Sequence, residues 1–164
     1  MPVQLDDLDL RLLRELQRSN QLPVSELADR VHSSPATCIR RVKRMREEGV
    51  IVADVSIIDP AMFGKSMTVI VEVTIERERP ELIDLFKRSV LKNERILHCY
   101  YVTGDADFVL LVHVADMEEY DAIITDLFHD NTNIKQFKSL IAIRKIKSST
   151  HYPVTRYTGA ESAR

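Results

Sequence analysis

Five basic residues and no acid occur between Ser34 and Arg46, and this run carries the clearest chemistry in the sequence. Ser34 is a favourable helix N-cap and Pro35 suits the first helical position, so the sequence predicts a helix that begins there. At 3.6 residues per turn, one face of that helix presents a hydroxyl and three guanidiniums: Thr37, Arg40, Arg41 and Arg44. Guanidiniums pair bidentately with guanine edges or phosphates, so this face predicts contact with a polyanion.

Another face of the predicted helix is apolar. Cys38, Val42 and Met45 recur at helical spacing, with Ile39 beside them. One side is therefore expected to pack and the other to meet a ligand, which makes Ser34 and the four polar residues above candidates for DNA contact. A basic face that is merely solvated is the alternative. Cys38 can be read as a small packed residue or as a redox-sensitive thiol.

Two apolar-periodic segments precede the basic helix. Their apolar residues are Leu8, Leu12, Leu13 and Leu16 in the first, and Val24, Leu27, Ala28 and Val31 in the second. A short break at His32 and Ser33 then leads into the basic helix. Three helices with a tight break before the third are typical of a helix-turn-helix, whose last helix enters the DNA major groove. After Gly49, a favourable helix stop, residues 50–58 are β-like and predict a wing or a hinge strand.

The order of elements in the second half predicts a domain of α+β class. Strands are expected at 67–75, 96–103, 108–114 and 134–146, and helices at 80–90 and 116–128, with a turn at 104–107. This βαββαβ order is that of the ferredoxin-like fold, a four-stranded antiparallel sheet with two helices on one face. The chain is thus divided into a helix-turn-helix with its hinge strand, a linker, the ferredoxin-like domain and a tail, at 1–58, 59–65, 66–150 and 151–164.

Apolar residues occupy both faces of the predicted sheet. The strand at 69–73 and the strand at 109–114 carry them at odd and even positions alike. Because helices cover only one face, the other must be solvated or buried against a partner. Together with the apolar segment 50–58, this predicts at least a dimer.

Bulk properties exclude several classes of protein. The 164 residues are 45% hydrophobic and 29% charged with a net charge of −2, which is ordinary for a globular chain. No apolar run approaches the ~18 residues that span a bilayer, and the first residues do not form a signal peptide, so no membrane partner is expected. Two cysteines in different segments imply no disulfide framework, so a cytoplasmic, nucleoid-associated location is expected.

Residues with catalytic or metal-binding chemistry are scattered. His98, Cys99 and His113 fall on paired strands, but their spacing resembles no zinc motif and neighbouring strand residues point to opposite faces. No paired nucleophile and base and no glycine-rich phosphate loop is evident. Neither an enzyme nor a cofactor is therefore expected.

Five motifs together resemble the leucine-responsive/asparagine-regulator (Lrp/AsnC) family. They are Leu-Asp-Asp-Leu-Asp-Leu-Arg-Leu-Leu-Arg-Glu-Leu-Gln at 5–17, Ser-Glu-Leu-Ala-Asp-Arg-Val at 25–31, Ser-Ser-Pro-Ala-Thr-Cys-Ile-Arg-Arg-Val-Lys-Arg-Met at 33–45, Glu-Glu-Gly-Val-Ile at 47–51 and Val-Thr-Gly-Asp-Ala-Asp-Phe at 102–108. The resemblance covers residues 5 to about 155. It implies a prokaryotic transcription regulator with a winged helix-turn-helix and a C-terminal amino-acid-sensing (RAM) domain.

The resemblance also implies partners and a ligand site. Members of the family form dimers through the hinge strand and the sheet, and dimers often join into octamers that bind pseudo-palindromic double-stranded operators. An amino acid or related small effector binds between dimers near the Gly-Asp-x-Asp turn. The residues implicated here are Thr103, Gly104, Asp105 and Asp107 in the turn, with Gln136 and Ser139 on the last strand as further polar partners. Phe137 departs from the small hydroxyl residue common in the family, and is expected to tune which effector fits.

Two alternatives remain at this point. Asp and Gly are ordinary hairpin-turn residues, so Asp105 and Asp107 can have a purely structural role. As sensors, their carboxylates can accept hydrogen bonds from an ammonium group, while backbone N–H groups of the turn hold a carboxylate. The chain can also be an architectural DNA-organising protein that has no effector.

Overall fold

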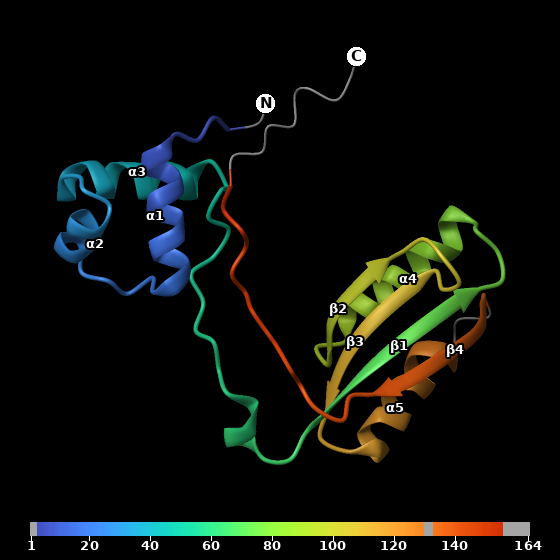
Figure 1. The fold of residues 1–164 in the computed structure, drawn as a ribbon. Coiled ribbons are helices and arrows are strands. Elements are labelled where there is room, and N and C mark those ends of the chain that lie inside the picture. The colour runs from blue at the N-terminus through green and yellow to red at the C-terminus, as the bar shows by residue number, and fades with distance from the viewer. Residues whose placement is uncertain (1–2, 130–132, 156–164) are drawn as a thin grey trace. The chain divides into compact units, whose positions relative to one another are not determined.

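Three helices form the core of the N-terminal part of the chain (Figure 1). The computed structural model describes residues 3–129 and 133–155, and these helices are α1 (Asp7–Arg18), α2 (Val24–Arg30) and α3 (Pro35–Glu47). The Ser34 hydroxyl accepts a hydrogen bond from the Thr37 backbone N–H at 3.2 Å, which caps α3 as expected. The buried side chains are those at the predicted apolar positions: Leu12, Leu27, Ala28, Val31, Cys38, Val42 and Met45. The helix-turn-helix prediction is confirmed.

The segment after α3 differs from the prediction of a β-strand. Gly49 takes a φ of +70° and ends the helix, and the backbone N–H of Val50 donates to the Met45 carbonyl at 2.8 Å. Residues 52–58 then form no strand with any described part of the chain, and Val52, Val55 and Ile57 are largely exposed. A strand requires a neighbour for its backbone groups, and a single chain supplies none here.

The C-terminal segment returns to the N-terminal helices. The chain forms two compact units, Ile58–Ile146 and a second one that joins residues up to Ile57 with the segment from Lys147. In that second unit the Gln17 side chain makes two hydrogen bonds with the Tyr152 backbone, accepting from its N–H at 2.5 Å and donating to its carbonyl at 3.0 Å. Arg14 donates to the Val154 carbonyl at 2.9 Å. The first part of the segment predicted as a C-terminal tail is thus held along α1, with hydrogen bonds at Tyr152 and Val154.

A four-stranded antiparallel sheet forms the unit Ile58–Ile146, after a short 3-10 helix at Pro60–Phe63 (Figure 1). The sheet order is β2-β3-β1-β4, and its elements are β1 (Met67–Ile75), α4 (Pro80–Lys92), β2 (Ile96–Tyr101), β3 (Phe108–Val114), α5 (Met117–His129) and β4 (Ile134–Ile141). Strands β2 and β3 pair as the expected hairpin. Both helices pack on the same face of the sheet. The ferredoxin-like prediction is confirmed.

The alternation of side chains divides the sheet into a buried and an open face. Val69, Val71 and Val73 lie under the helices opposite Val112, Leu110 and Phe108. The intervening residues form the open face, on which the apolar members include Ile70, Val109, Leu111 and Leu140. The single-chain fold thus leaves apolar side chains on a face that its own helices do not cover.

Two strands end earlier than the sequence predicted. Strand β4 stops at Ile141 rather than 146, because its only neighbour is β1, which begins at Met67. Beyond the hydrogen bond from the Ala142 N–H to the Thr68 carbonyl, β4 has no backbone to pair with. Strand β2 ends at Tyr101, before the turn that was expected to follow Thr103. Of the break expected at 130–133, only Asn133 is described, as a turn residue, and residues 130–132 and the tail beyond 155 lie outside the described part of the chain. No helix among the described residues is long and apolar enough to cross a membrane.

Candidate nucleic-acid and ligand sites

The carboxylate of Asp9, on α1, is fully buried and binds two arginines of α3. Its Oδ2 atom lies 2.6 Å from Nη2 of Arg44 and 3.3 Å from Nη1 of Arg41. The same Arg41 nitrogen lies 2.7 Å from the Asp6 carboxylate. The side chains of Arg41 and Arg44 are only 22% and 35% exposed as a result. These contacts fix α3 against the first turn of α1.

Asp6 and Asp9 are themselves held by a capping box. Asp6 is the N-cap of α1 and accepts from the Asp9 backbone N–H, while Asp9 accepts from the Asp6 N–H at 3.1 Å. The hydrogen bond from the Asp9 N–H, with the nearby Arg41 guanidinium, lowers the pKa of Asp6 below its ordinary value of 3.8. The paired Asp6 carboxylate raises the pKa of Arg41 in turn. The Asp6 carboxylate therefore remains ionised under neutral conditions, where it attracts the Arg41 guanidinium.

These ion pairs change the expected surroundings of two arginines in the predicted DNA-contacting face, whose contacts with DNA stay a prediction. Arg41 and Arg44 were expected to present free guanidiniums with Arg40, but the buried Asp9 carboxylate draws both towards α1. The sequence signal was present, since Asp6 and Asp9 precede a leucine-rich helix, but spacing within α3 does not show which arginines meet an acid from another helix. An unpaired buried carboxylate would be costly, so the pairing outcompetes solvent exposure.

The side of α3 that faces outward is consequently displaced around the helix from the predicted face of Thr37, Arg40, Arg41 and Arg44. Its exposed members include Ala36, Ile39 and Arg40 in the first half of the helix and Lys43 in the second. Arg40 has no hydrogen-bond or ion-pair partner within the described residues, and Lys43 has only a loose pair with Glu47 at 3.7 Å. Thr37 is half-buried, and its Oγ1 accepts from the Ser34 hydroxyl at 2.9 Å. Of the predicted residues, the structure leaves Ser34, Thr37 and Arg40 at the surface around the start of α3.

The turn between β2 and β3 forms the second candidate site. Gly104 takes a φ of +127°, and a Cβ built on it would meet nothing within 4 Å, so the space beside it is open. Thr103 and Asp105 are exposed, and the Asp105 carboxylate has no partner in the described parts of the chain. Asp107 is different, because its carboxylate accepts from the Ile75 N–H at 2.8 Å. Asp107 therefore holds the turn against the end of β1.

Strand β4 brings only one of its two predicted polar residues near this turn. Gln136 pairs with Thr74, whose hydroxyl donates to the Asp105 carbonyl at 3.3 Å, so Gln136 lies next to the strand residue that contacts the turn. Ser139 instead lies opposite Val71 on the helix-covered face and hydrogen-bonds the Tyr120 hydroxyl of α5. Burial raises the pKa of Tyr120. Phe137 also faces the helices and packs against Phe128, with ring centroids 4.5 Å apart. Thr74 was missed by sequence reasoning, since only strand register places it there.

Comparison with known proteins matches two separate parts of the chain. Residues 5–52 match a winged helix-turn-helix DNA-binding domain, and residues 68–152 match the Lrp/AsnC ligand-binding domain. An uncharacterised HTH-type transcriptional regulator of Sinorhizobium fredii is 44% identical over 93% of this chain and 90% of its own length. The chain belongs to the Lrp/AsnC family.

Solved structures of the family share the whole architecture. An AsnC family transcriptional regulator from Agrobacterium tumefaciens aligns with a TM-score of 0.85 at 32% identity, covering 91% of this chain and 97% of that one. A transcriptional regulator from Neisseria meningitidis, solved as a complex with L-Met, aligns with a TM-score of 0.84 at 27% identity over 92% and 97%. This Lrp/AsnC protein is thus a transcriptional regulator with a DNA-binding and a ligand-binding domain, and not an enzyme.

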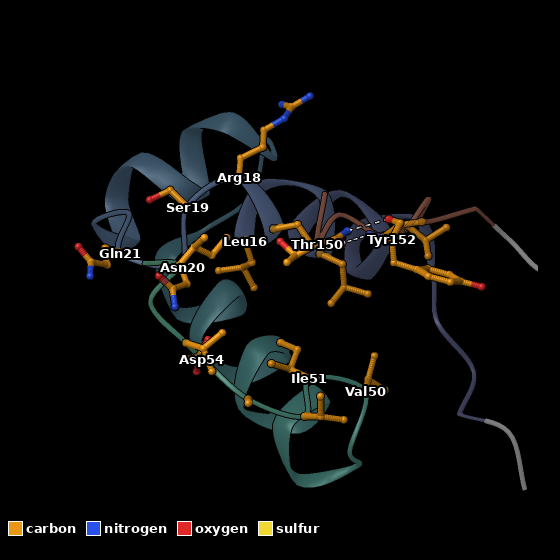
Figure 2. A pocket seen from close by; sticks show the side chains of 18 of the residues that line it. Leu16, Arg18, Ser19, Asn20, Gln21, Val50, Ile51, Asp54, Thr150 and Tyr152 are labelled. Atoms are coloured by element: carbon orange, nitrogen blue, oxygen red, sulfur yellow. Dashed lines mark hydrogen bonds between the residues drawn. The ribbon is translucent and has the colours of Figure 1, made fainter. Parts of the chain in front are cut away.

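A cavity of about 840 Å3 lies in the DNA-binding unit of this Lrp/AsnC protein (Figure 2). Leu16 of α1 and the C-terminal residues Thr150 and Tyr152 form one side, and Val50 and Ile51 line another. The exposed segment 52–57 continues this lining. The cavity is therefore bounded by the same segment that lacks a strand partner in the single chain.

Removal of the buried carboxylate is expected to destabilise the DNA-binding unit. Asp9→Ala leaves Arg41 and Arg44 without their shared acceptor and should lower the free energy of unfolding by about 3 kcal/mol. This value is at the lower end of the range for a broken buried ion pair, because both arginines are partly exposed. Urea unfolding followed by circular dichroism measures this. The exposed acid of α2 serves as control, since Asp29→Ala should change stability by less than about 0.5 kcal/mol. If Asp9→Ala and Arg44→Ala have additive effects in a double-mutant cycle, the coupling is absent.

Proposed function

We propose that this protein is a sequence-specific transcriptional regulator that binds a pseudo-palindromic operator as a dimer or larger oligomer and responds to an amino acid. The observation that carries the DNA-binding part is the outward-facing side of α3, where Arg40 and Lys43 are exposed and can reach DNA. Ser34 and Thr37 lie at the N-terminus of the same helix. In helix-turn-helix proteins the N-terminal part of the recognition helix contacts base edges in the major groove. Arg41 and Arg44 act in this proposal by holding that helix in place.

The proposed effector site is the β2–β3 turn. The unpartnered Asp105 carboxylate can accept hydrogen bonds from an ammonium group, and the open space beside Gly104 lets a ligand approach the backbone. Thr74 and Gln136 add a hydroxyl and an amide at the same end of the sheet. The L-Met bound to the Neisseria meningitidis relative supports an amino acid as the ligand class. In this proposal Asp107 and Ser139 stabilise the fold of the domain and do not contact the ligand.

The proposed dimer covers the open face of the sheet and the segment 50–58. Ile70 and Leu111 are neighbours on that face, and together with His98 and Tyr100 they border a hollow of about 200 Å3. A second copy would bury these side chains and supply a backbone partner for segment 50–58. The proposed larger form is an octamer built from such dimers. An effector that binds at a contact between dimers would favour the assembly for which its affinity is higher.

The DNA-binding proposal predicts a selective loss of affinity. Arg40→Ala should weaken binding to fragments selected from a random DNA library by about 1–3 kcal/mol, because a base or phosphate contact is lost. Gel-shift titrations at several salt concentrations measure it, and a phosphate contact would also flatten the salt dependence. Arg88→Ala, an exposed arginine of α4, should bind as the wild type does. Equal affinity of Arg40→Ala and the wild type would contradict the assignment.

The effector proposal predicts a variant that binds DNA but no longer senses. Calorimetry against the twenty amino acids first identifies the ligand. Asp105→Asn should then bind it at least about tenfold more weakly, since a charge-assisted hydrogen bond contributes ~1.5–3 kcal/mol, while operator affinity without ligand stays unchanged. Asp121→Asn, on the exposed side of α5, is the matched control. Binding of no amino acid by the wild type would favour an architectural protein, and unaltered binding by Asp105→Asn would place the site elsewhere.

The oligomer proposal predicts a dependence on the open face. The wild type should scatter light as at least a dimer at micromolar concentration. Leu111→Glu places a charge in the covered face and should dissociate it, because an unpaired buried carboxylate is strongly unfavourable. Leu91→Glu introduces the same charge at an exposed position of α4 and should leave at least a dimer. A monomeric wild type would rule out the proposed interface.

A further inference from the structure

One apolar side chain of the recognition helix is turned outward. Ile39 is 54% exposed, whereas Cys38, Val42 and Met45 on the same helix are at most 7% exposed. The N-terminal core is complete without Ile39, because these three residues supply its α3 contribution. Single exposed apolar residues are common on protein surfaces, so exposure alone assigns no role.

The position of Ile39 within α3 makes it informative. Arg41 and Arg44 are drawn to Asp9 on one side and the core residues occupy another, so the remaining arc of the helix must face outward. Ile39 lies in that arc between Ala36 and Lys43, one helical turn from each, and next to Arg40. It is also close to the N-terminus of α3, which begins at Pro35. Ile39 therefore occupies the part of the helix that reads base edges in helix-turn-helix complexes.

We propose that Ile39 reads a thymine methyl group in each half-site of the operator. The inference rests on the proposed entry of α3 into the major groove. Among the groups that base pairs present there, the C5-methyl of thymine is the apolar one, and apolar side chains recognise it by contact. Lys43 and Arg40 share the outward arc with Ile39, one turn along the helix and next in sequence, and these cations can bind phosphates or guanine and so keep that arc in the groove. Ile39 thereby discriminates in favour of thymine, which the two cations do not recognise by its methyl group.

Uracil substitution tests the contact, because it removes the methyl group and leaves Watson–Crick pairing intact. Half-sites are first selected from a random library, and each thymine is then replaced singly by deoxyuridine. Wild-type affinity should fall about fourfold per half-site at one position, which corresponds to the ~0.8 kcal/mol of one buried methyl-sized group. Ile39→Ala should bind the thymine operator about as weakly as the wild type binds the uracil one. Replacing the thymine at that position by uracil should not weaken the binding of Ile39→Ala further.

Two controls separate this inference from the proposed function. Arg40→Ala should bind thymine and uracil operators more weakly by the same factor, and so keep the sensitivity to the methyl group. Ile39→Ala should unfold at the wild-type temperature, since the side chain is outside the core. Wild-type binding that is indifferent to uracil at every position, or an Ile39→Ala variant that remains sensitive, would overturn the role of Ile39 alone. Absence of sequence-specific binding by the wild type would instead overturn the proposed function.

Discussion

The buried Asp9 carboxylate is the constraint on which the DNA-binding unit depends. A carboxylate removed from water requires cationic or hydrogen-bonding partners, and Asp9 obtains them from Arg41, Arg44 and the Asp6 N–H. Because the acid is in α1 and both arginines are in α3, one group sets how these helices pack. Asp6 completes the arrangement by capping α1 and binding Arg41. The angle of the recognition helix is thus specified by charge as well as by its apolar core.

This ion-pair cluster also limits which side chains of α3 face outward. A helix has a limited circumference, and the arc taken by the core and by Arg41 and Arg44 leaves the arc of Ile39, Arg40 and Lys43. The surface that results is mixed, with one apolar side chain beside two cations. Cations alone give affinity with little dependence on sequence, whereas contacts to base edges discriminate between sequences.

Strand register imposes the corresponding constraint on the ligand-binding domain. With both helices on one face, each strand residue is committed either to the core or to the open face. Ser139 and Phe137 are committed to the core side, where they contact Tyr120 and Phe128, while Gln136 falls beside Thr74. The Gly104 turn projects from the end of this sheet, anchored by Asp107. The described part of the chain leaves the open, apolar face and the exposed residues 52–58 uncovered.

The sequence by itself determined the helices of the N-terminal unit, the βαββαβ order and the apolar positions of the core, because periodicity, capping residues and turn glycines are local signals. Ser34, Pro35 and Gly49 delimit α3 in this way. Strand ends were less determined: β4 stops at Ile141 because β1 offers no further partner. The roles of Arg41, Arg44, Asp107 and Ser139 were decided only by tertiary structure. Each depends on a group that is distant in sequence, and neither helical spacing nor strand alternation shows which distant group a polar side chain will meet.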